Sequence, residues 1–223
     1  SSSSSSTAAK SAASTTTTAT AGSGPVPYAM LCDAFVKIEE ITGRLEITSI
    51  MTTLFEDVIA ANPDDLESVL FLAGNKVAPP HANVILGIGD SLLVKCIVQT
   101  FGRTTNAVKE QYDEEGDLGI VAEMSRSSQK QLAWGAKPKP LMVTQVLKAL
   151  RTIAEIEGNK SQDRKIGAIQ KLLRDCRGPE ARFLIRALQG KLRIGLAETT
   201  VLIALAHAVV RSPPMTALQN YES

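Results

Sequence analysis

Ten Lys and Arg residues lie between Lys160 and Arg193, against three Asp and Glu residues in the same interval. The run ends in the stretch Gly190-Lys-Leu-Arg-Ile-Gly195, where two cations stand between two glycines. A helix that starts after such a loop offers free N–H groups and the positive end of its dipole, and both favour phosphate. The chemistry indicated is therefore recognition of a polyanion through charge and backbone.

A second glycine pair, Gly87 and Gly89, lies in a stretch without cations, Leu86-Gly-Ile-Gly-Asp90. Such a loop would contact a sugar or a phosphate through its backbone alone. As a nucleotide-binding motif the pair is too short, because it lacks the third glycine and the preceding strand. The first loop also has a simpler interpretation, with Gly190 as a helix C-cap and Gly195 as a tight turn, and the basic run could be a solvated surface.

The other residues that could do chemistry are too few and too scattered for a catalytic or metal centre. The chain has three Cys and two His, without Cys-x-x-Cys or His-Glu-x-x-His, so no metal site is expected. The cysteines lie in apolar helical patterns, which indicates reduced thiols in an intracellular protein. No nucleophile, base and orienting group can be assembled. The longest apolar run, residues 201–210, has about half the length that a membrane span needs.

Helices must position the two loops, because apolar residues recur at helical spacing from Pro25 onward and strand-like alternation is nowhere sustained. We therefore expect an all-α fold. The first 24 residues are almost entirely Ser, Thr, Ala and Gly, which predicts a disordered tail over 1–24. A helical hairpin is expected first, with arms that end at Gly43 and Asn62. Further helices are expected at about 63–74, 89–101, 104–115, 117–124, 143–157, 161–177, 179–189 and 197–211.

An internal repeat becomes visible when the second half of the chain is laid over the first. The order hairpin, Pro-helix-Gly, Leu-x-Ile-Gly and apolar helix occurs twice. The matched positions are Phe35, Ile38 and Ile41 with Leu150, Ile153 and Ile156, Pro63 and Gly74 with Pro179 and Gly190, and Leu86–Gly89 with Leu192–Gly195. We therefore expect a helical array built from two pseudo-symmetric half-domains.

The two copies carry opposite charge, although the whole chain has a net charge of only +1. Residues 28–101, the acidic half, hold 4 Lys and Arg against 10 Asp and Glu, a net charge of −6. Residues 143–211, the basic half, hold 13 against 6, a net charge of +7. The basic half is therefore the expected polyanion-binding part of the chain.

Several stretches are more specific than charge or periodicity. They are Pro27-Tyr28 with Phe35-Val-Lys-Ile-Glu-Glu40, Val121-Ala-Glu-Met-Ser-Arg-Ser-Ser-Gln129, Glu180-Ala-Arg-Phe183 and Gly190-Lys-Leu-Arg-Ile-Gly-Leu-Ala-Glu198. Together they resemble the DNA-binding domain that precedes the catalytic core in eukaryotic ATP-dependent DNA ligase I. The resemblance runs from about Pro25 to Pro214. It implies an all-helical pseudo-twofold array that lies on the minor groove beside a nick and grips the backbone through loops and helix ends.

The resemblance also implies domain limits and contact residues. Residues 25–223 would be this DNA-binding domain, incomplete at its C-terminal end. The implied contacts to DNA are Gly190, Lys191, Arg193 and Gly195, then Gly87 and Gly89, and then Ser125, Arg126 and Ser127. For the serines the alternative is a helix-ending loop with capping hydroxyls.

The implied function is that of a noncatalytic module in a ligase that seals nicks during DNA replication, repair and recombination in the nucleus. No Lys-x-Asp-Gly, the adenylation motif of that family, occurs in the chain. We therefore expect no cofactor here, with ATP and Mg²⁺ used by catalytic domains elsewhere in the parent protein. The expected partners are nicked double-stranded DNA and those catalytic domains, with no membrane contact and a monomeric state. The alternative is a helical scaffold that binds another protein through its basic half.

Overall fold

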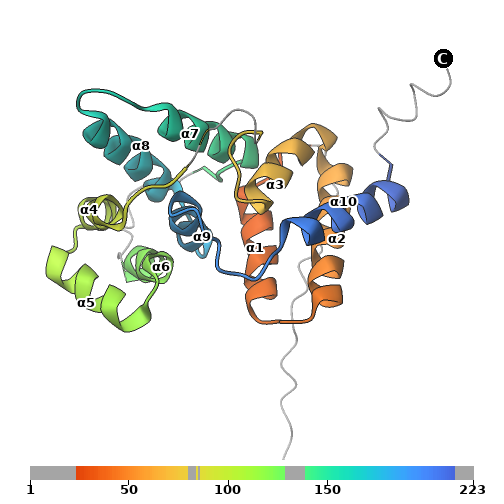
Figure 1. Cartoon of the computed structure of the whole chain (residues 1–223), viewed down its shortest axis with the longest axis horizontal. Coiled ribbons are helices and arrows are strands. Elements are labelled where there is room, and N and C mark those ends of the chain that lie inside the picture. The colour runs from red at the N-terminus through yellow and green to blue at the C-terminus, as the bar shows by residue number, and fades with distance from the viewer. Residues whose placement is uncertain (1–23, 80–83, 85, 129–138, 214–223) are drawn as a thin grey trace, which may run out of the picture.

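The computed structural model describes residues 24–79, 84, 86–128 and 139–213 (Figure 1). Within these ranges the regular elements are helices, and the β-type contact is one isolated antiparallel bridge between Pro27 and Met142. The prediction of an all-α fold is confirmed. The tail expected over 1–24 lies outside the described residues except for Gly24, and so does the C-terminal end of the chain from residue 214.

Every helix expected from the sequence is present, with ends that differ by a few residues. The elements are α1 Tyr28–Glu39, α2 Arg44–Ala61, η1 Pro63–Asp65, α3 Leu66–Ala73, α4 Asp90–Phe101, α5 Thr105–Glu115, α6 Leu118–Ser128, α7 Val143–Glu155, α8 Ser161–Asp175, α9 Glu180–Leu188 and α10 Glu198–Arg211. The helix expected from Pro63 starts as the short 3₁₀ turn η1, where the Asn62 side chain accepts the Asp64 N–H at 3.3 Å.

Helix α6 continues to Ser128, past the end predicted at 124. The hydroxyls of Ser125, Ser127 and Ser128 each donate to the carbonyl four residues earlier, at 2.6 to 2.9 Å. Such bonds satisfy a serine inside a helix, where it otherwise competes with the backbone. The serines are therefore part of the last turns of α6, and the alternative of a helix-ending loop with capping hydroxyls is wrong.

The repeat seen in the sequence has a matching backbone contact between the copies. The Tyr28 N–H donates to the Leu141 carbonyl at 2.7 Å, and the Val143 N–H donates to the Val26 carbonyl at 3.0 Å. These are the same bond made twice with the roles exchanged, at the sequence separation that also relates Phe35 to Leu150. The two first helices, α1 and α7, thus begin side by side around an approximate twofold axis.

The helices of the two copies interlock. The second helix of each copy packs against the fourth of the other, α2 against α10 and α8 against α4. The first helix of each packs against the third of the other, α1 against α9 and α7 against α3. In Figure 1 the α4–α8 pair lies at the left and the α2–α10 pair at the right, with α9 between these two pairs. Each half-domain therefore buries its apolar faces mainly against helices of the other half-domain, so the two copies form one core.

The connector helices α5 and α6 extend this core on one side. Helix α6 packs against α9 and α4, and α5 packs against α4 and α6 (Figure 1). The Phe35 ring on α1 meets the Phe183 ring on α9 edge to face, with centroids 5.1 Å apart. Helix α9 is thus held between α6 and α1, which fixes the start of the loop that follows its C-terminal end.

Candidate functional site

The two glycine loops, about a hundred residues apart in the sequence, meet at the C-terminal end of α9. The Ile88 N–H donates to the Leu188 carbonyl at 2.8 Å. A Cβ on Gly190 would lie 3.3 Å from the Leu86 carbonyl oxygen, which shows how closely the two backbones approach. Six residues predicted from the sequence are exposed on this surface. They are Gly87, Gly89, Gly190, Lys191, Arg193 and Gly195, and we call this surface the loop face.

Gly190 has both conformational and steric reasons to be glycine. Its φ is +81°, and its N–H and that of Lys191 bond back to the carbonyls of Ala187 and Arg186 at 3.0 Å, which ends α9 in a left-handed turn. The close Leu86 carbonyl leaves little room for a side chain. The simpler interpretation of Gly190 as a helix cap is therefore correct, and the same cap brings the second loop alongside.

Arg193 is one of three described residues other than glycine with positive φ, at +58°. Its Nη1 donates to the Gly116 carbonyl at 2.9 Å, at the corner between α5 and α6. This bond uses one of the five N–H donors of the guanidinium. The side chain is exposed, so the corner holds a cation at the rim of the loop face.

The match between Gly89 and Gly195 is only approximate. Gly89 is the N-cap of α4 with φ −65°, whereas Gly195 has φ +67° and precedes the N-cap of α10, Ala197, by two residues. A Cβ at either glycine would meet nothing within 4 Å. The repeat therefore holds for the helices, and their N-terminal loops differ in register and conformation.

Each of the two helix N-termini carries an acid as its first residue. Neither N-cap makes a side-chain hydrogen bond to its helix. On α4 the Asp90 carboxylate accepts from Gln189 Nε2 at 2.7 Å and from the Tyr112 hydroxyl at 2.9 Å, and the bond to Asp90 raises the pKa of Tyr112. On α10, Glu198 pairs with Lys76 at 2.5 Å. Both acids thus have partners within the protein.

The contact between Asp90, Tyr112 and Gln189 was not expected from the sequence. The three residues come from α4, α5 and the end of α9, and they join the connector to both copies beside the loop face. No spacing within any one segment signals this cluster, because each residue alone is an ordinary polar position in or at the end of a helix. Only the packing of three helices brings them together.

The basic run divides into two groups. Arg182 is half-buried and Arg186 is buried, and both are engaged in ion pairs with the acids Glu39, Asp117 and Glu123 rather than presented to a polyanion. Their assignment to a polyanion-binding face is therefore wrong. Of the other eight cations, Lys165 is half-buried and seven are exposed. These seven are Lys160, Arg164, Lys171, Arg174, Arg177, Lys191 and Arg193.

The three contacts predicted on α6 have different environments. Ser125 is buried at 1% exposure, and its hydroxyl also accepts from Arg103 Nη1 at 2.8 Å, so it braces α6 from within. Its prediction as a surface contact is corrected on that ground. Arg126 is half-buried and its Nε donates to the Cys176 carbonyl at 2.9 Å. Ser127 is exposed.

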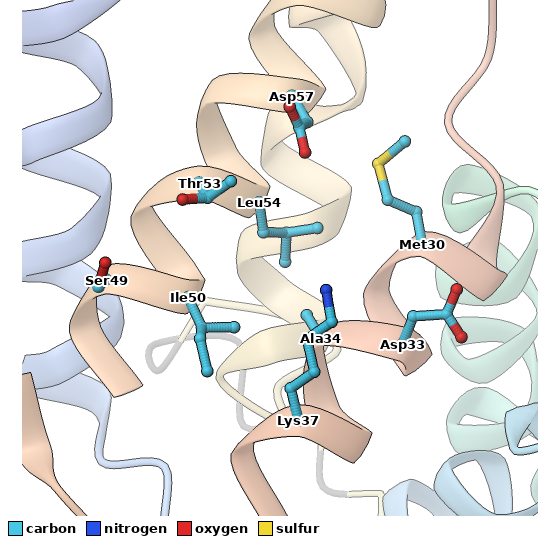
Figure 2. Close-up of a pocket in the computed structure, with 9 residues that line it drawn as sticks. All are labelled: Met30, Asp33, Ala34, Lys37, Ser49, Ile50, Thr53, Leu54 and Asp57. Atoms are coloured by element: carbon cyan, nitrogen blue, oxygen red, sulfur yellow. The ribbon is translucent and has the colours of Figure 1, made fainter. Parts of the chain in front are cut away.

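A hollow of about 300 Å³ lies between α1 and α2 in the acidic half (Figure 2). Asp33 and Lys37 line it from α1, and Asp57 lines it from α2 (Figure 2). Burial and then the neighbouring Glu56 raise the pKa of Asp57, against the opposing effect of Lys37. The mixed charge of this hollow does not suit a polyanion, and its side chains do not form the nucleophile and base that catalysis needs. The loop face is therefore the better candidate site. Among the described helices, none combines the length and apolar character of a membrane span.

Comparisons with known proteins show which family the chain resembles. The model of the family "DNA ligase N terminus" matches residues 27–206. The chain is 42% identical to DNA ligase 1 of Schizosaccharomyces pombe over 84% of its own length and 24% of that protein. It is 42% identical to DNA ligase 1 of Saccharomyces cerevisiae over 84% and 25% of the two chains, and 41% identical to DNA ligase 1 of Arabidopsis thaliana over 86% and 25%. The chain thus spans about a quarter of the length of these relatives.

Proposed function

This chain belongs to the DNA ligase N-terminus family, and we propose that it is a noncatalytic module that binds double-stranded DNA at a nick. The observation that carries the proposal is the loop face. There two glycine loops from different copies of the repeat lie together, with Lys191 and Arg193 exposed on the same surface. A surface of open backbone and cations suits a sugar-phosphate chain better than it suits a small substrate.

In the proposed binding mode the loop face lies against the DNA backbone along the minor groove. Gly87, Gly89 and Gly195 let the phosphates and sugars approach the protein backbone closely, while Lys191 and Arg193 neutralise phosphate charge. The exposed cations of α8 add a long-range attraction. Contacts of this kind position the protein without reading base edges, so we propose binding with little sequence preference.

We further propose that the parent protein is an ATP-dependent ligase that acts in the nucleus during replication and repair. Its catalytic domains would use ATP and Mg²⁺, and they would be partners of this module, which itself would act as a monomer. By holding the two ends of a nick, the module would raise the effective concentration of the catalytic domains at their substrate.

The test is a binding titration of the chain with nicked duplex over a range of salt concentrations. If about 5 to 7 phosphates are contacted, log affinity falls with log salt at a slope of about −4.5 to −6.3, since each phosphate contributes about −0.9. An intact duplex of the same sequence measures the preference for the nick, and a scrambled nicked duplex measures sequence preference. Binding that ignores salt would refute the proposal and favour a scaffold that binds protein.

A further inference from the structure

Five charged side chains form an ion-pair cluster beneath the loop face. Glu39 of α1 accepts from Arg182 and from Arg186 through its two oxygens, each at 2.6 Å. Arg182 also pairs with Glu123 at 2.5 Å, and Arg186 pairs with Asp117 at 2.9 Å. The side chains of Arg186 and Asp117 are only 4% and 7% exposed. The cluster therefore ties both copies and the connector together, with Arg186 and Asp117 buried and the other three side chains about one fifth to one quarter exposed.

Arg186 joins this cluster to the loop that presents Arg193. Its carbonyl accepts the Lys191 N–H at 3.0 Å, and its Nη1 donates to the Leu192 carbonyl at 3.2 Å. One residue thus fixes the Gly190–Lys191 peptide unit and the Leu192–Arg193 peptide unit, the second of which leads directly into Arg193. The backbone of Arg193 has a left-handed conformation, which residues other than glycine adopt only when their surroundings impose it.

Asp117 acts on the same arginine from the other side. Its Oδ2 accepts from Arg186 Nε, and its Oδ1 accepts the Gly119 N–H at 2.7 Å, which fixes the first turn of α6. The preceding residue is Gly116, whose carbonyl accepts the hydrogen bond from the Arg193 side chain. The Asp117–Arg186 pair therefore connects the backbone support and the side-chain support of Arg193.

We infer that the buried Asp117–Arg186 pair is a positioning device that holds Arg193 in place for DNA phosphate. This inference rests on the proposed function. It assigns a part in polyanion binding to an acid and to a buried arginine that do not touch the ligand. The sign of the effect sets it apart from general electrostatics, since removing an acid from a DNA-binding protein raises its net charge and should tighten binding.

The test is the binding of nicked duplex by Asp117→Asn, which keeps an oxygen for the Gly119 N–H and removes the charge opposite Arg186. We expect binding about tenfold weaker than that of the parent, the lower end of what one charge-assisted hydrogen bond is worth. The salt slope should shrink by about one unit, because the Arg193 contact is lost although no cation was removed. The matched control is Asp113→Asn on exposed α5, which should bind as well as the parent or slightly better.

A double-mutant cycle separates positioning from mere loss of stability. With Arg193→Ala already present, Asp117→Asn should have little further effect on affinity, because both changes remove the same contact. A structural role unrelated to Arg193 would instead give additive losses with an unchanged salt slope. Binding is measured at a temperature below the unfolding transition of every variant, as shown by circular dichroism.

A second variant meets the case in which loss of the Asp117 partner of Arg186 unfolds the protein. Asp117→Asn with Arg186→Met removes both charges, leaves the net charge of the chain unchanged and leaves no buried ion of this pair alone. It too should bind about tenfold more weakly, by the same lost hydrogen bond. If the parent binds and a folded variant binds as tightly with the full salt slope, the inference is overturned and the proposed function stands. If the parent does not bind, the proposed function itself fails.

Discussion

Arg193 allows the strain of its backbone and the charge of its side chain to be tested separately. Arg193→Ala and Arg193→Gly remove the same side chain and the same hydrogen bond to the Gly116 carbonyl. They differ in how well the new residue tolerates a φ of +58°. Glycine adopts this conformation freely, whereas alanine clashes through its Cβ. The two variants should therefore differ in stability and agree in DNA affinity.

The magnitudes follow from the local structure. A left-handed conformation costs a residue with a Cβ about 1 to 2 kcal/mol, and the greater freedom of glycine in the unfolded chain returns about 0.5 to 1 kcal/mol of that difference. The free energy of unfolding of Arg193→Gly should therefore be up to about 1.5 kcal/mol higher than that of Arg193→Ala. Both should lose one charge-assisted hydrogen bond to phosphate, worth about 1.5 to 3 kcal/mol when desolvated.

Two measurements on the same samples decide the outcome. Urea denaturation gives the free energy of unfolding, and titration with nicked duplex at several salt concentrations gives affinity and slope. We expect the affinity of both variants to fall at least about tenfold and the slope to shrink by about one unit. If both variants are folded and bind nicked duplex like the parent, Arg193 is only part of a helix connector and the DNA-facing surface lies elsewhere.

Three further predictions address the loops, a buried acid and the missing chemistry. Gly89→Val should keep the fold, because φ is −65° and nothing else lies within 4 Å of the new Cβ. It should weaken DNA binding about threefold to tenfold, because the side chain keeps the DNA from approaching the backbone. The salt slope should stay unchanged, because no cation is lost. Gly195→Val should weaken binding more, because its φ of +67° adds strain to the obstruction; equal binding by both variants and the parent would remove the loops from the interface. Burial raises the pKa of Glu180, against the opposing effect of the Arg177 N–H. The folded protein therefore binds this proton more tightly than the unfolded chain does. As a result, the free energy of unfolding falls as pH rises from the ordinary carboxyl pKa to the raised one. Glu180→Gln should flatten that fall in denaturation at several pH values, and an unchanged pH profile would contradict the assignment. Incubation with labelled ATP and Mg²⁺ should leave the chain unlabelled, since no Lys-x-Asp-Gly is present; a covalent AMP adduct would show that the catalytic lysine had been misplaced.

The helices could be predicted from the sequence because their signals are local. Pro63 and Gly74 mark the ends of a helix by the geometry that each residue allows, and apolar spacing shows which face is buried. The repeat was visible for the same reason, since matched helices need matched apolar positions. The meeting of the two glycine loops has no local signal, because the close approach of Gly190 to Leu86 depends on how the two copies interlock.

The errors concern residues whose role depends on tertiary partners. Ser125 has the polarity of a contact residue, but it is buried against Arg103 and bonded within α6. Arg182 and Arg186 were counted with the basic surface because spacing along a helix does not reveal acids on other helices. A hydrogen-bonding side chain looks the same in a sequence whether it faces a ligand or a neighbouring helix.

The opposite charges of the two halves thus have two physical uses. Part of the positive charge on the basic half pairs with Glu39 of the acidic half and with acids of the connector, inside the interface that joins the copies. Buried pairs of this kind specify a particular arrangement more clearly than they stabilise it, because burial removes each ion from water. The remaining cations stay exposed, and Lys191 and Arg193 stand on the loop face itself. The buried pairs and the exposed cations are therefore coupled, since the pairs fix the loop that carries the cations.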